Sequence, residues 1–145
     1  MATVIDILAV KGSHVQSIGP ESSVLDAATR MNERKIGSLL VMDGGRLIGI
    51  ITERDMLQRV LVTRRDPAET AVGDVMTTEV LCCQPHTTLE EARGVMKNRR
   101  IRHLPVLDDG EQLLGLISIG DLNAHEANDH EHTISVLEAY IYGRA

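Results

Sequence analysis

The stretches GIITERD (residues 49–55) and GLISIGD (residues 115–121) decide the fold of this chain of 145 residues. Each places a glycine, two large aliphatic residues, a hydroxyl residue, two variable residues and an aspartate in the same order. Similarity that recurs at a fixed distance along a chain is the mark of an internal repeat. The two stretches therefore predict a duplicated unit.

The duplication extends upstream of these stretches. At a spacing of 65, the segment around Ala27 and Met31 aligns with the segment around Ala92 and Met96, and one inserted residue near Gly110 makes the later spacing 66. Other aligned pairs are Pro20 with Pro85, Ile36 with Ile101, and Asp43 with Asp108. We expect a first repeat over residues 1–65, a second over 66–122 and a C-terminal helical tail over 123–145.

Each repeat has the same order of expected elements. A short turn (6–8 or 74–76) and a brief extended segment precede a helix that starts at Ser23 or Thr88, with an acid three residues later as in a capping box. These helices end in basic residues at 34–35 and 99–100. Two strands joined by a hairpin follow, at 38–42 and 47–52, and at 103–107 and 113–118. Helices at 53–62 and 119–128 close the repeats.

The expected fold is α+β, with two β-α-β-β-α repeats. A small sheet with one apolar face is marginally stable alone, so we expect the repeats to pack face to face and share a core. That core must be aliphatic, because the chain has no Trp, no Phe and only two Tyr.

Composition also limits the possible partners. A formal net charge of −6 and the lack of aromatic stacking residues argue against nucleic-acid binding. The N-terminal apolar stretch stops at Lys11 and lacks a basic start, so it predicts neither a membrane span nor a signal peptide. The adjacent Cys82 and Cys83 favour buried or half-buried thiols over redox or metal chemistry. These features together predict a cytoplasmic protein.

The repeated stretch combines groups that could hold a nucleotide. Thr52 and Ser118 end a strand, and Asp55 and Asp121 fall in the first turn of the next helix. Backbone N–H groups at a helix start lack intrahelical partners and favour anions. A carboxylate can accept both hydroxyls of a ribose, while a hydroxyl and amides can hold a phosphate. The alternative is that these residues only cap their helices.

GIITERD and GLISIGD, together with RIRHLPVLDD (residues 100–109), resemble the signature of cystathionine-β-synthase (CBS) domains, and the resemblance covers about residues 6–122. It implies a tandem pair with pseudo-two-fold symmetry, whose two inter-repeat clefts bind AMP, ADP, ATP, NAD(H) or S-adenosylmethionine. It also implies a disc-like homodimer, with a regulatory role and no required cofactor.

The resemblance also implies roles for single residues. Asp55 and Asp121 would bind ribose hydroxyls, Thr52 and Ser118 ribose or phosphate oxygens, and Thr77 the base edge. The remaining implied nucleotide-binding residues face the adenine, line the clefts or meet phosphates: Lys35, Ile36, Ser38, Ile50, Arg54, Arg100, Arg102, His103, Leu104, Leu116 and Ile119. No catalytic or metal residue is implied.

Differences between the repeats predict unequal sites, because the second has Arg102 and His103 where the first has Gly37 and Ser38. The first in turn has Arg54 where the second has Gly120. Two alternatives stay open for the polar candidates. The basic residues at 34–35 and 99–100 could be solvated helix-end charges, and His103 could be a neutral, packed histidine.

The tail carries His125, His130 and His132 among acidic residues, which we interpret as a solvated connector rather than a metal site. Farther on, Ile134, Leu137 and Ile141 recur at helical spacing. This apolar stripe either folds back on its own module or packs on a partner subunit, and we favour the dimer interface.

Three functions remain in competition. The first is a non-catalytic sensor of adenine nucleotides that acts on a dimer or a protein partner in signal transduction. The second is an enzyme, which is disfavoured because the sequence has no nucleophile–base pair, P-loop or metal set. The third is a structural scaffold with empty clefts, and an S-adenosylmethionine binder is a variant of the first.

Overall fold

The computed structural model describes residues 1–129 and confirms the α+β class. The elements in order are α1 (Val4–Lys11), β1 (Ser17–Ile18), α2 (Val24–Arg34), β2 (Ser38–Asp43), β3 (Arg46–Thr52), α3 (Glu53–Met56), the π-helical turn η1 (Leu57–Leu61), α4 (Val72–Val75), α5 (Leu89–Arg99), β4 (His103–Leu107), β5 (Leu113–Ser118) and α6 (Ile119–Asp129). In this part of the chain, no helix is long and apolar enough to cross a membrane.

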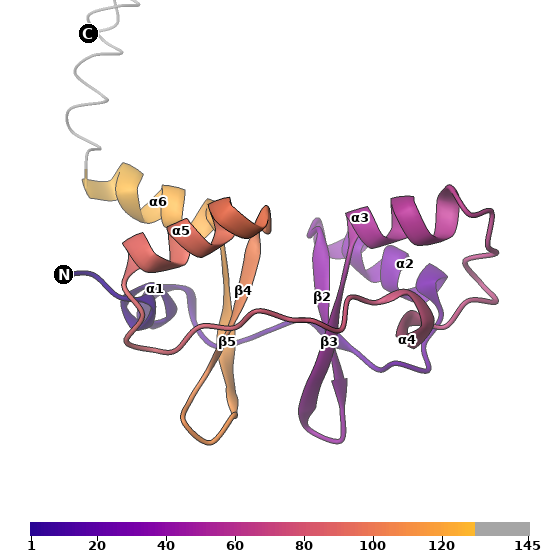
Figure 1. Cartoon of the computed structure of the whole chain (residues 1–145), viewed down its shortest axis with the longest axis horizontal. Helices are drawn as coiled ribbons and strands as arrows, with labels where there is room; N and C mark the ends of the chain where they lie inside the picture. The colour runs from indigo at the N-terminus through magenta and orange to yellow at the C-terminus, as the bar shows by residue number, and fades with distance from the viewer. Residues whose placement is uncertain (130–145) are drawn as a thin grey trace, which may run out of the picture. The chain divides into compact units, whose positions relative to one another are not determined.

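The chain forms two compact units. Unit 2 contains His14–Cys82 and Asp109–Leu113. Its sheet has the order β1-β2-β3, with β1 parallel and β3 antiparallel to β2. Figure 1 shows β2 and β3 as a hairpin. Its core is aliphatic, as expected, and includes Val24, Leu39, Ile51 and Val72.

Unit 1 contains Met1–Ser13, Cys83–Asp108 and, within the described residues, Leu114–Asp129. Strands β4 and β5 form its two-stranded sheet, and helix α5 packs against both β4 and α6 (Figure 1). Its core combines Val4 and Leu8 from α1 with Ala92, Leu104 and Ile117 from the second repeat.

The opening helix of each sequence repeat packs on the body of the other repeat. Helix α1 precedes the first repeat's strands, yet Val4 N donates to Thr87 O (2.8 Å) in unit 1. Helix α4 precedes the second repeat's strands, yet Val72 N donates to Ser22 O (2.8 Å) in unit 2. A compact unit therefore draws on both halves of the sequence.

The local signals at the helix ends are confirmed. Ser23 and Thr88 are N-caps whose hydroxyls accept from the N–H groups of Asp26 and Glu91.

The expected turn at residues 6–8 is instead the helix α1, because Val4, Ile7 and Leu8 present one buried face at helical spacing. The expected helix at 53–62 contains the π-helical turn η1. The tail beyond Asp129, with its apolar stripe, lies outside the described residues.

Candidate functional site

The first candidate site is the corner where β3 ends and α3 begins. Thr52 is the N-cap of α3, and Asp55 is the third helical residue. Thr52 N and Oγ1 donate to Asp55 Oδ2 (3.0 and 3.2 Å), while Asp55 N donates to Thr52 Oγ1 (3.2 Å). This is a reciprocal capping box, so the capping role considered from the sequence is real.

The other oxygen of Asp55 is held by one distant residue and one nearby residue. Thr77 Oγ1 donates to Asp55 Oδ1 (2.9 Å), and Arg59 Nε lies 4.0 Å from the same oxygen. Arg59 also donates to the carbonyls of Val75 and Met76. The side chain of Asp55 is only 8% exposed. Asp55 therefore fastens the segment after α4 to the corner.

Gly49, the first residue of the repeated stretch, permits this attachment. A Cβ at Gly49 would lie 2.6 Å from Met76 Sδ and 2.9 Å from Thr77 O. The close approach allows Ile50 and Thr77 to exchange two backbone hydrogen bonds, Ile50 N to Thr77 O (2.9 Å) and Thr77 N to Ile50 O (2.8 Å). The glycine is thus required for packing between the strand and the opening segment.

The second candidate site is the matching corner between β5 and α6. Ser118 N donates to Asp121 Oδ2 (2.8 Å), and Asp121 N donates to Ser118 Oγ (3.1 Å). Lys11 Nζ, at the end of α1, donates to Asp121 Oδ2 and to Leu116 O, both at 2.7 Å. The Asp121 side chain is 23% exposed, so this carboxylate reaches solvent more readily than that of Asp55.

The helix-start amides are more fully used than the sequence suggested. In each corner the first helical N–H donates to the carbonyl just before the first strand of the hairpin, β2 or β4: Glu53 N to Gly37 O (3.1 Å) and Ile119 N to Arg102 O (2.9 Å). The third helical N–H, that of the aspartate, donates to the hydroxyl of the N-cap residue. As expected, these N–H groups lack intrahelical partners, but the fold satisfies two of the first three in each corner with other groups, which leaves fewer of them for an anion.

Two of the basic candidates lie at helix ends. Lys35 and Arg100 are the C-caps of α2 and α5, in the left-handed conformation (φ 56° and 54°), and both are exposed. Arg54 and Arg102 are exposed as well, and His103 is half-buried at the start of β4. Leu104 lies in the core of unit 1, and Ser38 and Ile50 are buried. Whether these residues bind a ligand stays a prediction.

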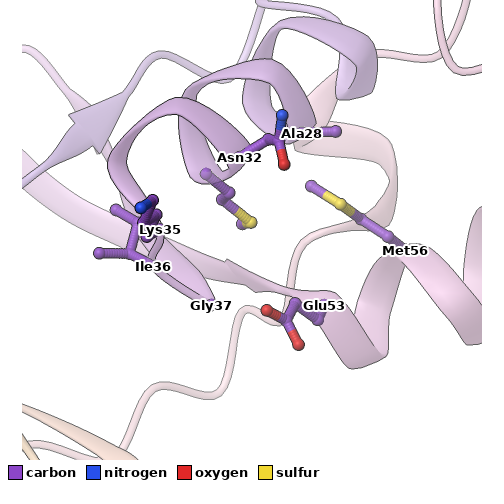
Figure 2. A pocket seen from close by; sticks show the side chains of 8 residues that line it. Ala28, Asn32, Lys35, Ile36, Gly37, Glu53 and Met56 are labelled. Carbon is purple, nitrogen blue, oxygen red and sulfur yellow. The ribbon is translucent and has the colours of Figure 1, made fainter.

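A pocket of about 470 Å³ lies in unit 2, beside the first corner. Figure 2 shows Asn32 and Met56 directed toward it from α2 and α3, with the carboxylate of Glu53 at its edge. Lys35 and Ile36 are the predicted site residues that line it. Thr52 and Asp55 do not line it.

Sequence reasoning missed Lys11 and Arg59, which hold the two aspartates. Arg59 could have been found, because it stands four residues after Asp55 on the same helical stretch. In the sequence, Lys11 marks only the end of the N-terminal apolar stretch, and its partner Asp121 is 110 residues away. No local pattern reveals that pairing.

The cysteines and histidines form no metal-like group within residues 1–129. Cys83 is buried and pairs in parallel with Val106, in keeping with a strand residue, while Cys82 is exposed. Partial burial of the Cys82 thiol nevertheless raises its pKa. His125 lies on α6, and His130 and His132 lie outside the described residues.

The chain belongs to the CBS domain family, whose model matches residues 5–62 and 72–127. The mitochondrial CBS domain-containing protein CBSX3 of Arabidopsis thaliana is 35% identical over 97% of this chain and 72% of its own length. An inosine-5'-monophosphate dehydrogenase of Nitrosopumilus maritimus is 35% identical over 73% of this chain, which corresponds to only 21% of that enzyme.

Solved structures agree with this assignment and confirm the tandem pair. A putative signal-transduction protein with CBS domains from Burkholderia ambifaria MC40-6 has a TM-score of 0.84 and 40% identity, covering 88% of this chain and 96% of that one. CBSX2 in complex with AMP has a TM-score of 0.73 and 26% identity, covering 88% of this chain and 98% of that one.

Proposed function

We propose that this protein is a non-catalytic regulatory module that binds an adenine nucleotide, with AMP, ADP, ATP and NAD(H) as the candidate ligands. The observation that carries the proposal is the AMP complex of CBSX2, which shares the tandem fold over 88% of this chain. The duplicated corners supply this chain's own chemistry for the same class of ligand, a carboxylate beside a hydroxyl at a strand-to-helix turn.

The second corner is the stronger of the two candidates. Asp55 is 5% exposed, and both of its oxygens accept from groups of unit 2, so sugar hydroxyls would have to displace a buried network. Asp121 is more exposed, and its long-range partner is a lysine side chain that is itself 37% exposed. Replacing the Lys11–Asp121 ion pair by contacts with a ligand costs little free energy, because exposed ion pairs contribute about 0–1 kcal/mol to stability.

Ligand binding would regulate by favouring one arrangement of the module or of its assembly, as any ligand with differential affinity must. We infer a homodimer, supported by exposed apolar residues in and directly after η1, at Leu57, Leu61 and Val62. A protein partner on the same surface is the alternative. Cytoplasmic location remains our proposal from the sequence.

The test is mass spectrometry of small molecules that co-purify with the native protein, followed by thermal melts with AMP, ADP, ATP, NAD and S-adenosylmethionine. Ligand at a hundredfold excess over Kd stabilises by about 2.7 kcal/mol, which corresponds to a rise in Tm of roughly 5–10 °C for a chain of this size. If no adenine compound co-purifies or raises the Tm, the scaffold function is favoured. If S-adenosylmethionine alone raises the Tm, the protein is still a ligand-binding regulatory module, but its ligand is S-adenosylmethionine.

A further inference from the structure

In both units, a neighbouring segment donates hydrogen bonds to a strand carbonyl and to the aspartate of the corner, but the donor groups differ between the units. In unit 2, Thr77 N donates to Ile50 O (2.8 Å) and Thr77 Oγ1 donates to Asp55 Oδ1 (2.9 Å). In unit 1, the single ammonium of Lys11 donates both to Leu116 O and to Asp121 Oδ2, each at 2.7 Å. Leu116 and Asp121 are the sequence equivalents of Ile50 and Asp55.

The packing around these contacts is also equivalent. A Cβ at Gly49 would meet Met76 Sδ at 2.6 Å, and a Cβ at Gly115 would meet Leu8 Cδ2 at 2.8 Å. The segments that end at Thr77 and at Lys11 therefore approach the same place on the two strands. A lysine ammonium in unit 1 contacts the strand carbonyl and the aspartate, for which unit 2 uses a backbone amide and a hydroxyl. Lys11 shares its aspartate oxygen with the N–H of the N-cap Ser118, whereas Thr77 binds the oxygen that the N-cap N–H leaves free.

This difference decides which corner can open. Removing the Thr77 contacts would break a pair of backbone hydrogen bonds and leave a carboxylate with 8% side-chain exposure short of donors. Removing the Lys11 contacts requires only rotation of a flexible side chain that is 37% exposed. Asp121 can thus be uncovered while α1 and β5 stay in place.

We propose that Lys11 determines ligand selectivity at the second corner, by leaving Asp121 only for a ligand that brings its own phosphate. This inference rests on the proposed function. When sugar hydroxyls take Asp121, the displaced ammonium keeps its charge, stays close to the ligand and can pair with an anionic partner on it. A phosphate monoester carries about −1.5 to −2 charges at neutral pH and supplies that partner. An unphosphorylated nucleoside leaves the ammonium without one.

The experiment is isothermal titration of the full chain with AMP and with adenosine, which differ only by the phosphate. The variants are Lys11→Gln, which keeps a polar chain but removes the charge, and Lys97→Gln as the matched control on the exposed last turn of α5. Asp121→Asn is added because it reports whether the binding involves the second corner.

We expect the native protein and Lys97→Gln to prefer AMP over adenosine by the same factor. In Lys11→Gln that factor should fall roughly tenfold or more, because one charge-assisted contact to the phosphate is lost and Asp121 is uncovered without it. Asp121→Asn should weaken AMP binding.

Each opposing result has its own meaning. If AMP binds but Lys11→Gln changes AMP and adenosine affinity by the same factor, or changes neither, the selectivity role is overturned and the proposed function stands. The same holds if Asp121→Asn binds AMP as the native protein does. If neither compound binds any variant and no other adenine nucleotide raises the Tm, both proposals fail.

Discussion

Thr77 and Asp55 lie 22 residues apart and are joined by a hydrogen bond of 2.9 Å from Oγ1 to Oδ1. This contact ties the segment after α4 to the corner between β3 and α3. The repeated sequence stretch therefore has a structural role, in addition to any role in ligand binding. Its glycine admits the opening segment, its hydroxyl residue caps the helix, and its aspartate holds the two together.

Thr77→Val should destabilise unit 2. The substitution keeps the shape of the side chain but removes the donor to a carboxylate that is 8% exposed, and an unsatisfied buried acceptor costs about 1–3 kcal/mol. Urea denaturation measures the loss. Thr78→Val, at the exposed neighbouring position, should change stability by less than about 0.5 kcal/mol. Equal effects of the two variants would contradict the role given to Thr77.

Gly49→Ala and Gly94→Ala should change the free energy of unfolding in opposite directions. A Cβ at Gly49 would lie 2.9 Å from the backbone oxygen of Thr77, which cannot move without breaking its bond to Ile50, so a loss of about 1–3 kcal/mol is expected. A Cβ at Gly94, within α5, meets nothing within 4 Å, and alanine there should stabilise by about 0.5–1 kcal/mol. Thermal melts of both variants are sufficient, and stabilisation by Gly49→Ala would refute the close-approach argument.

The elements of each repeat were predictable because their signals are local. Ser23 and Thr88 cap their helices, Gly44 and Gly45 make the hairpin turn with positive φ, and β5 has the predicted bounds. The pairing of Lys11 with Asp121 was not predictable, since it depends on α1 packing in the unit formed mostly by the second repeat. Likewise, the sequence left open whether Thr52 and Asp55 cap a helix or hold a ligand, and the structure establishes the capping.

Leu61→Lys should weaken self-association. Leu61 is 69% exposed beside Val62, also 69% exposed, and a charge there would be desolvated in an apolar dimer interface. Sedimentation equilibrium at micromolar concentrations should show a dimer for the native protein and a monomer for the variant. Val10→Lys, at a 90% exposed position on α1, serves as the control and should remain dimeric. A native protein that sediments as a monomer would remove the homodimer from the proposal.

The most direct test of the central claim is the AMP-induced rise in Tm of the native chain compared with that of Asp121→Ala. Asp26→Ala is the matched control, because Asp26 is also the third residue of a capped helix but has no part in either corner. At a hundredfold excess over the native Kd, we predict a rise of roughly 5–10 °C for the native protein and for Asp26→Ala. Asp121→Ala should lose most of that rise. An undiminished rise in Asp121→Ala would contradict the assignment of Asp121 as a ligand-binding residue.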